Sequence, residues 1–176
     1  MVVKKIISIL CLSLMLAGCQ QSPEQTNTSN NEQKEAAKKL FAQGMMLLQQ
    51  KDLKGAVESL EASIKVDPSD PNPYLVLGQI LIKAGEYEHA VDFLDQTAKT
   101  FPNNGTIFYM LSIANRMAGK NLPAVLAARR SYEIFNAAGD TANAQTSAII
   151  LEELIKEAQQ EQDKTAKTDV APSNKK

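Results

Sequence analysis

The sequence predicts an all-α fold: a short α-solenoid of three helix pairs, followed by a C-terminal capping helix. Three observations indicate this fold. Small, large and proline residues recur every 34 positions between residues 37 and 138, a spacing typical of helix-turn-helix repeats. Tryptophan is absent and aromatic residues make up 5% of the chain, so the core must consist of small and aliphatic residues that favour helices. The segment after the last repeat has apolar residues at three-and-four spacing.

The first 18 residues predict a removable leader. Lys4 and Lys5 precede an apolar run from Ile6 to Leu16, and small residues follow it. This order of charged, apolar and small residues is typical of a signal peptide. The apolar run is too short to span a bilayer, which needs about 20 apolar residues.

The tetrad Leu16-Ala17-Gly18-Cys19 resembles the lipobox of bacterial lipoproteins. The resemblance implies cleavage before Cys19, diacylglycerol on its sulfur and acylation of its new amine. Two or more acyl chains anchor a protein stably in a membrane, whereas a single chain does not. The next residue is Gln20 and not the Asp that favours inner-membrane retention, so the resemblance implies the outer membrane, facing the periplasm. The alternative is an ordinary secretory signal that contains a cysteine.

The division of the chain follows from composition. Residues 1–18 form the leader, and residues 19–32 contain Cys19 and a polar segment without apolar periodicity, which predicts a flexible tether. The repeat domain is expected over 33–160. Residues 161–176 are rich in Lys, Asp and Thr, which predicts a disordered tail.

Three repeats are expected, over residues 37–70, 71–104 and 105–138. Equivalent positions form six series, each spaced by 34: Leu40, Tyr74 and Phe108; Gly44, Gly78 and Ser112; Leu47, Leu81 and Asn115; Ala56, Ala90 and Ala124; Leu60, Leu94 and Ala128; Pro68, Pro102 and Asn136. This register resembles the tetratricopeptide repeat. The second repeat fits best and the third departs most. The resemblance implies a right-handed superhelix with a shallow concave face.

Local signals set the expected helix boundaries. Pro68 and Pro102 end helices, Asp70 and Asn104 can cap the helices that follow, and glycines mark the turns at Gly85 and Gly119. The expected helices are 33–50, 53–66, 71–84, 87–100, 105–118, 121–136 and a capping helix over 141–160, which Asp140 or Thr141 begins. The capping helix has two predicted faces: an apolar stripe of Ala144, Ala148, Leu151, Ile155 and Ala158, and a polar outer face of Glu152, Glu153, Lys156 and Glu157.

In the tetratricopeptide family, the first helix of each pair lines the concave face. Helical spacing points nine residues toward it: Phe41, Met45, Leu48, Leu75, Gln79, Ile82, Tyr109, Ile113 and Arg116. This predicted groove is apolar with one cation and suits a helix or an extended peptide with apolar side chains. The Lys and Asn clamp by which some family members hold a chaperone tail is missing. The alternative is that the same residues form core or a self-association surface.

The sequence predicts no catalytic, metal or cofactor site. His89 is the only histidine, and we interpret it as a surface residue. There is no glycine-rich phosphate loop and no Gly-x-Ser-x-Gly elbow, and both cysteines, Cys11 and Cys19, belong to the leader and its cleavage point. The formal net charge of −1 argues against a nucleic-acid partner.

These observations favour an interaction module of the bacterial cell envelope that catalyses nothing and binds other envelope proteins. It resembles the repeat lipoproteins that act as pilotins for secretins in pilus biogenesis, although those are usually longer. It also resembles repeat lipoproteins that serve as adaptors for cell-wall hydrolases. The alternative is a homodimer that associates through its apolar strip and acts as a structural spacer.

Overall fold

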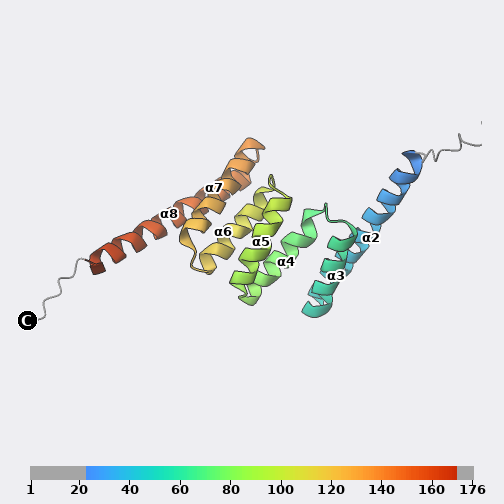
Figure 1. The fold of residues 1–176 in the computed structure, drawn as a ribbon, viewed down its shortest axis with the longest axis horizontal. Helices are drawn as coiled ribbons and strands as arrows, with labels where there is room; N and C mark the ends of the chain where they lie inside the picture. The colour runs from blue at the N-terminus through green and yellow to red at the C-terminus, as the bar shows by residue number, and fades with distance from the viewer. Residues whose placement is uncertain (1–22, 170–176) are drawn as a thin grey trace, which may run out of the picture.

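The predicted all-α solenoid is confirmed. The computed structural model describes residues 23–169, with side chains over 30–162, and this part of the chain contains helices and no strands. The helices are α2 (Pro23–Gln49), α3 (Leu53–Val66), α4 (Pro71–Ala84), α5 (Tyr87–Thr100), α6 (Gly105–Met117), α7 (Asn121–Ala137) and α8 (Thr141–Asp169). They follow one another along a single axis, with α2 at one end and α8 at the other (Figure 1). The leader and Cys19 lie outside the described residues.

The inner helices lie where the sequence predicted them, to within one residue. Polar caps explain this agreement. The carboxylate of Asp70 accepts a hydrogen bond from the backbone N–H of Asn72 at 2.9 Å, and Asn104 caps α6 in the same way. Asp140 accepts from the N–H of Asn143 at 3.1 Å, so it is Asp140 that caps α8.

The two outer helices are longer than predicted. α2 begins at Pro23 and α8 ends at Asp169, so parts of the predicted tether and of the predicted tail are helical. Extending a helix costs little once it has formed, and Pro23 suits the first helical position. Apolar periodicity reports burial and not helicity. The first buried side chain of α2, among those described, is Ala37, which explains why the sequence located the packed part and missed the extension.

Close helix crossings organise the first two pairs. A Cβ on Gly44 would lie 2.9 Å from Cγ of Leu60, and a Cβ on Gly78 would lie 2.7 Å from Cδ2 of Leu94. Both leucines are fully buried. The absent side chain of the glycine is therefore the space that the leucine fills.

The third pair solves the same packing problem with different residues. Ser112 and Ala128 stand where the other repeats have glycine and leucine, and both are buried. A larger residue on one helix is matched by a smaller residue on the other. The two residues that made the third repeat fit the repeat pattern less well therefore compensate each other in size.

Two apolar clusters continue the core along the array. The larger one joins α5, α6 and α7 through seven buried residues: Ala90, Leu94, Ala98, Ile107, Leu111, Ala114 and Ala127. The second joins α7 and α8 around Leu154, which is 1% exposed. The buried stripe of α8 therefore includes Leu154, which the predicted stripe omitted.

Buried hydroxyl groups tie the second helix of two pairs to the first. Ser63 and Ser131 occupy equivalent repeat positions and donate to the carbonyl oxygens of Ala37 and Gly105, at 2.8 and 2.9 Å. The Ser131 hydroxyl also lies 2.9 Å from that of Ser147 on α8. This contact links the third pair to the capping helix.

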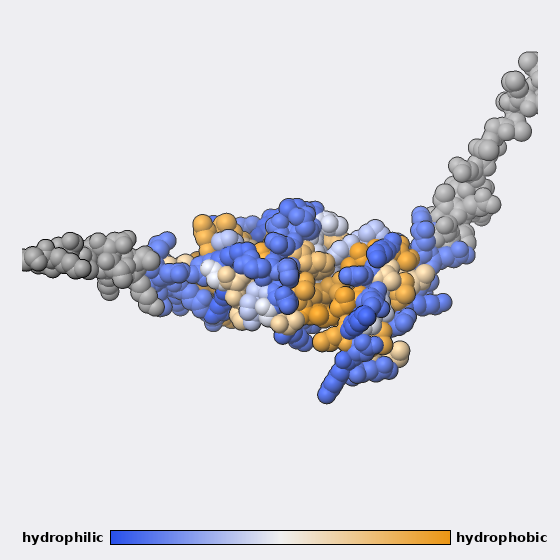
Figure 2. All heavy atoms as spheres, turned by 60° about the horizontal axis from the view of Figure 1, so that its bottom comes forward, coloured by the Kyte–Doolittle hydropathy of each residue, from blue (hydrophilic) through white to orange (hydrophobic). Residues whose placement is uncertain are grey.

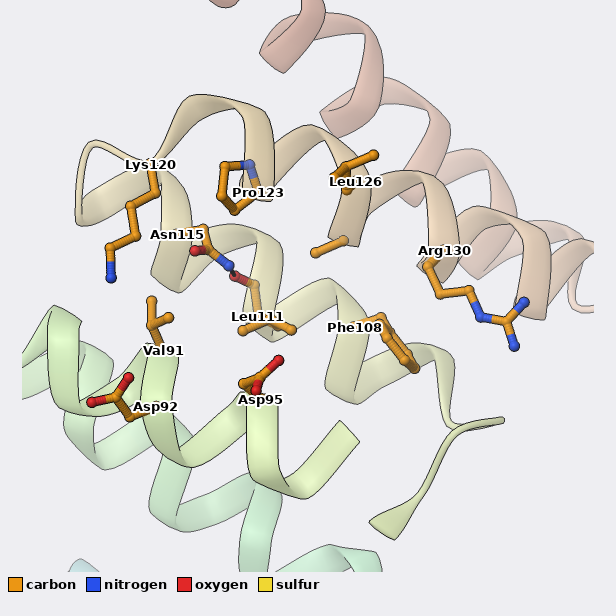
Figure 3. A pocket seen from close by; sticks show the side chains of 11 residues that line it. Val91, Asp92, Asp95, Phe108, Leu111, Asn115, Lys120, Pro123, Leu126 and Arg130 are labelled. Carbon is orange, nitrogen blue, oxygen red and sulfur yellow. Dashed lines mark hydrogen bonds between the residues drawn. The ribbon is translucent and has the colours of Figure 1, made fainter. Parts of the chain in front are cut away.

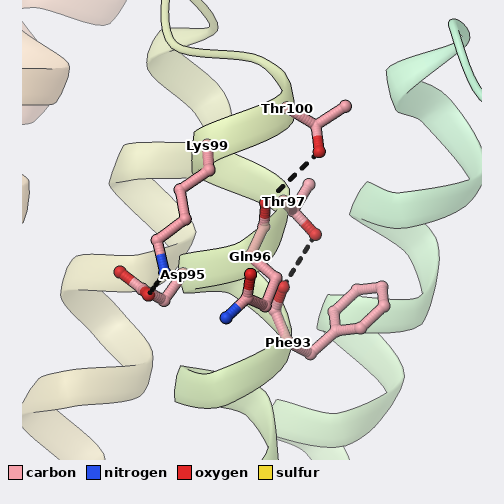
Figure 4. Close-up of polar contacts among 6 residues, drawn as sticks. All are labelled: Phe93, Asp95, Gln96, Thr97, Lys99 and Thr100. Carbon is pink, nitrogen blue, oxygen red and sulfur yellow. Dashed lines mark hydrogen bonds and ion pairs between the residues drawn. The ribbon is translucent and has the colours of Figure 1, made fainter.

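In the second repeat the equivalent residue is Thr97, which bonds within its own helix. Its hydroxyl donates to the carbonyl oxygen of Phe93 at 2.8 Å (Figure 4). Threonine readily bonds the carbonyl four residues earlier in a helix. The buried hydroxyl of Thr97 is thus satisfied without a contact to α4. On the exposed side of α5, Lys99 pairs with Asp95 at 2.7 Å.

The turns inside the three pairs share one backbone conformation. Gly85 and Gly119 have φ angles of 78° and 72°, as the predicted glycine turns require. Lys51 occupies the equivalent position in the first repeat with φ of 64°, the one non-glycine residue of positive φ in the described chain. A lysine in this region carries backbone strain that glycine avoids.

Lys51→Gly should therefore raise the free energy of unfolding, by about 1 kcal/mol. Gly85→Ala is the matched control. A Cβ at Gly85 meets nothing within 4 Å, so the substitution reports backbone strain alone and should destabilise by a similar amount. Urea denaturation followed by circular dichroism measures both. A Lys51→Gly protein that is less stable than the parent would contradict the proposed strain.

Candidate protein-binding surface

The nine residues of the predicted groove lie on the first helix of each pair, namely α2, α4 and α6. None of them belongs to the fully buried core. Met45 is 36% exposed, Gln79 is also exposed, and the other seven are half-buried. Leu75 and Ile82 pack against the larger core cluster with part of their surface. The groove face therefore keeps apolar surface that the core does not use.

A hollow of about 330 Å³ lies where α2 and α3 meet α4. It brings together two predicted groove residues, Leu48 and Gln79, and it is also lined by Leu53, Val76, Ile80, Lys83 and Ala84. Leu53 is 57% exposed and Met46, nearby in sequence, is 51% exposed. Apolar residues gather in the half of the molecule nearer α2 on the face drawn in Figure 2.

Sequence reasoning missed Leu53, Val76 and Ile80. Val76 and Ile80 are four residues apart on α4 and lie next to groove positions, so their spacing was a usable signal. Leu53 begins a second helix, which the family resemblance assigns to the other face. Its place in the hollow depends on how the first repeat meets the second.

A second hollow, of about 200 Å³, contains Tyr109. It lies between α6 and the first turns of α8, and its other lining residues are Thr106, Phe135, Asn143, Thr146 and Ser147. The two hollows have different character: aliphatic side chains dominate the first, while hydroxyl and amide groups surround the tyrosine in the second. A peptide lying along this face would meet both surfaces.

Arg116, the one cation of the predicted groove, has carboxylate partners on α8. Its guanidinium lies 3.6 Å from Oε2 of Glu153 and also pairs with Glu157. Both carboxylates belong to α8, where we expected a solvent-facing polar surface. The sequence could not place them because the rotation of α8 about its axis depends on tertiary packing. These ion pairs connect α6 to α8 and offset the charge of Arg116.

The described residues offer little for catalysis. They contain no group of three or more His, Cys, Asp or Glu side chains that could hold a metal ion. His89 lies exposed at the start of α5, with Nδ1 3.1 Å from Oε2 of Glu86. No helix in this part of the chain is long and apolar enough to cross a membrane.

Comparison with known proteins supports the repeat assignment. A model of the tetratricopeptide repeat matches residues 47–112. No curated protein matches the sequence significantly. The match runs from position 47 in the first repeat, through the whole of the second, to position 112 in the third.

Solved structures with the same fold include bacterial secretion chaperones. PcrH from Pseudomonas aeruginosa superimposes with a TM-score of 0.63 at 19% identity, covering 81% of this chain and 98% of that one. PcrH in complex with the chaperone-binding region of PopD gives 0.63 at 19% identity, covering 71% and 95%. The Yersinia enterocolitica type III secretion translocator chaperone SycD gives 0.62 at 15% identity, covering 70% and 95%. At these identities the likeness establishes the fold alone.

Arg116→Ala should loosen the second half of α8. Amide hydrogen exchange of residues 153–169 is expected to accelerate by about two- to fivefold, as for the loss of an exposed ion pair, and the difference should shrink in 1 M salt. Lys156→Ala is the control, because Lys156 pairs with Glu152 inside α8 and makes no bridge to α6. Equal exchange in the parent and Arg116→Ala proteins would show that the bridge does not hold α8.

Proposed function

We propose that this chain is a membrane-anchored interaction scaffold of the bacterial cell envelope. It binds an apolar peptide or helix along the face formed by α2, α4 and α6. The observation that carries the proposal is the partial exposure of the groove residues: seven of the nine are apolar, they lie on the first helices of the three pairs, and none of them is fully buried. Apolar side chains that stay accessible together on a surface are a feature of binding sites.

The shape of the groove supports a peptide ligand. Its two hollows, of about 330 and 200 Å³, lie on successive parts of the same helix array. Such hollows suit single apolar or aromatic side chains that project from a helix or an extended segment. Met45 can adapt its thioether to ligands of different shape. PcrH, which shares the fold, has been solved with segments of PopD and of PopB bound.

The anchor rests on the sequence alone. The lipobox-like tetrad ends at Cys19 and follows a leader of the correct order, and residues 19–22 then connect it to α2. With acyl chains on Cys19, the array stands at the periplasmic surface of the outer membrane. Its ligand is another envelope protein, in the assembly of a complex such as a pilus secretin or in the recruitment of a cell-wall hydrolase.

Tyr109→Glu combined with Ile113→Glu should abolish partner capture without unfolding the chain. Two carboxylates would place charge where an apolar ligand must lose its water. The measurement is a pulldown from cross-linked envelopes, read by mass spectrometry beside the parent protein. Met45→Glu is a second test at a more exposed site of the same groove.

Ile149→Glu on α8 is the matched control, because Ile149 is 52% exposed and lies outside the groove. Circular dichroism checks that each variant folds. Unchanged capture by both groove variants would rule out the groove as the binding site. Capture of nothing except further copies of the chain would favour the self-associating spacer.

Cys19→Ser should release the protein from the membrane fraction. Serine cannot form the thioether to diacylglycerol, so incorporation of radiolabelled palmitate should be lost and the protein should be recovered without its anchor. Cys11→Ser, inside the leader, is the control and should leave labelling unchanged. Palmitate incorporation that survives Cys19→Ser would contradict the anchor.

A further inference from the structure

A third hollow lies outside the predicted groove and shares no residue with it. It measures about 490 Å³ and opens between α5 and α7, with α6 behind it (Figure 3). Val91, Phe108, Leu111 and Ala127 supply apolar surface. We call this site the α5–α7 hollow. Asp92 and Asp95 stand along its α5 side, and Leu126 and Arg130 along its α7 side (Figure 3).

The outer surface of α7 differs from its equivalents in the other repeats. Leu122 and Leu126 are 68% and 54% exposed, and they lie four residues apart on one side of the helix. In the second repeat the same two positions hold Glu88 and Asp92, and in the first repeat they hold Lys54 and Glu58. A single exposed leucine is ordinary. Two leucines that replace charges beside an apolar hollow indicate a surface that is covered by a ligand.

Asn115 adds a polar group at one end of the hollow. It stands where the first two repeats have Leu47 and Leu81, and it is 4% exposed. Its Nδ2 donates to the carbonyl oxygen of Leu111 at 2.9 Å, as the dashed line in Figure 3 shows. The amide oxygen is left to accept a hydrogen bond from a ligand.

Among the charged residues that line the hollow, the unpaired one is negative. Lys120 pairs with Glu88, and Arg130 lies 3.6 Å from Glu133 and over the Phe108 ring. Both cations that line the hollow therefore already have partners, while Arg129, exposed on α7, does not line it. On the α5 side, Asp92 has no ion pair among the contacts of the described residues, so it is available to a cation supplied by a ligand.

We propose that the α5–α7 hollow is a second docking site, which takes an amphipathic helix of a partner protein. The helix sets apolar side chains four residues apart against Leu126 and the hollow, and places lysine or arginine beside Asp92. A helix fits because two helices flank the site and the stretch from Lys120 to Arg130 spans ten residues, or about 15 Å.

The site can be tested with designed peptides and the full chain. The probe is a fluorescein-labelled 18-residue helical peptide with leucines along one stripe, lysines along one flank and glutamines elsewhere. Its matched partner has glutamate in place of each lysine. Fluorescence anisotropy should show tighter binding of the lysine peptide by at least about tenfold.

Leu122→Glu combined with Leu126→Asp installs the residues that the second repeat already carries at these positions, so the fold should persist. This variant should weaken binding of the lysine peptide by about tenfold or more. Asp92→Lys should reverse the preference, so that the glutamate peptide binds more tightly than the lysine peptide. Met45→Glu, in the groove, should leave the preference for the lysine peptide over the glutamate peptide unchanged, which separates this site from the proposed groove function.

Several results would overturn the proposal. Equal binding of the two peptides, or unchanged binding by the Leu122→Glu, Leu126→Asp variant, would show that the α5–α7 hollow does not bind the helical peptide. Loss of peptide binding on Met45→Glu would place the peptide in the groove. A concentration-dependent dimer in sedimentation that the double variant dissolves would identify a second copy as the occupant. Binding to phosphatidylglycerol vesicles that the double variant abolishes would identify a lipid surface.

Discussion

The fold depends on how closely the two helices of each pair cross. Gly44 and Gly78 bring their helices within contact of buried Leu60 and Leu94, and any Cβ would collide there. This contact fixes which side of α2 and α4 faces the partner helix. The groove side chains lie on the flank beside this contact, three residues before and one and four residues after each glycine, and they are only partly buried. The same helix crossing that stabilises each pair therefore also fixes the direction of the groove residues. These residues occupy the same positions in each of the three repeats.

Much of the fold is encoded in local signals that a sequence displays. Caps such as Asp70 and turn glycines such as Gly85 act on their immediate neighbours, so they located the inner helices to within one residue. Other features depend on contacts between distant segments. The pairing of Arg116 with Glu157 requires the orientation of α8, and the position of Leu53 in a hollow requires the junction between repeats. The helical extensions of α2 and α8 have no periodic apolar residues, so the sequence pattern could not predict them.

Comparison among the three repeats separates structural from functional departures. Ser112 and Ala128 depart from the other repeats together, and their sizes compensate across one helix crossing. Leu122 and Leu126 depart without any compensation inside the fold, because they remain exposed. The first kind of change preserves packing, whereas the second creates surface that needs a partner. The array thus presents two apolar surfaces, one on its first helices and one between α5 and α7, with the membrane anchor predicted at the α2 end.

The claim that the groove binds a partner is tested most directly with a photo-crosslinking amino acid in place of Ile113, introduced into the full chain in its native envelope. Glu61, exposed on α3, provides the control position. One discrete adduct with an envelope protein is expected at position 113 and none at position 61. Equal adducts at both positions, or an adduct at 113 with another copy of the chain alone, would contradict the claim that the groove binds a partner.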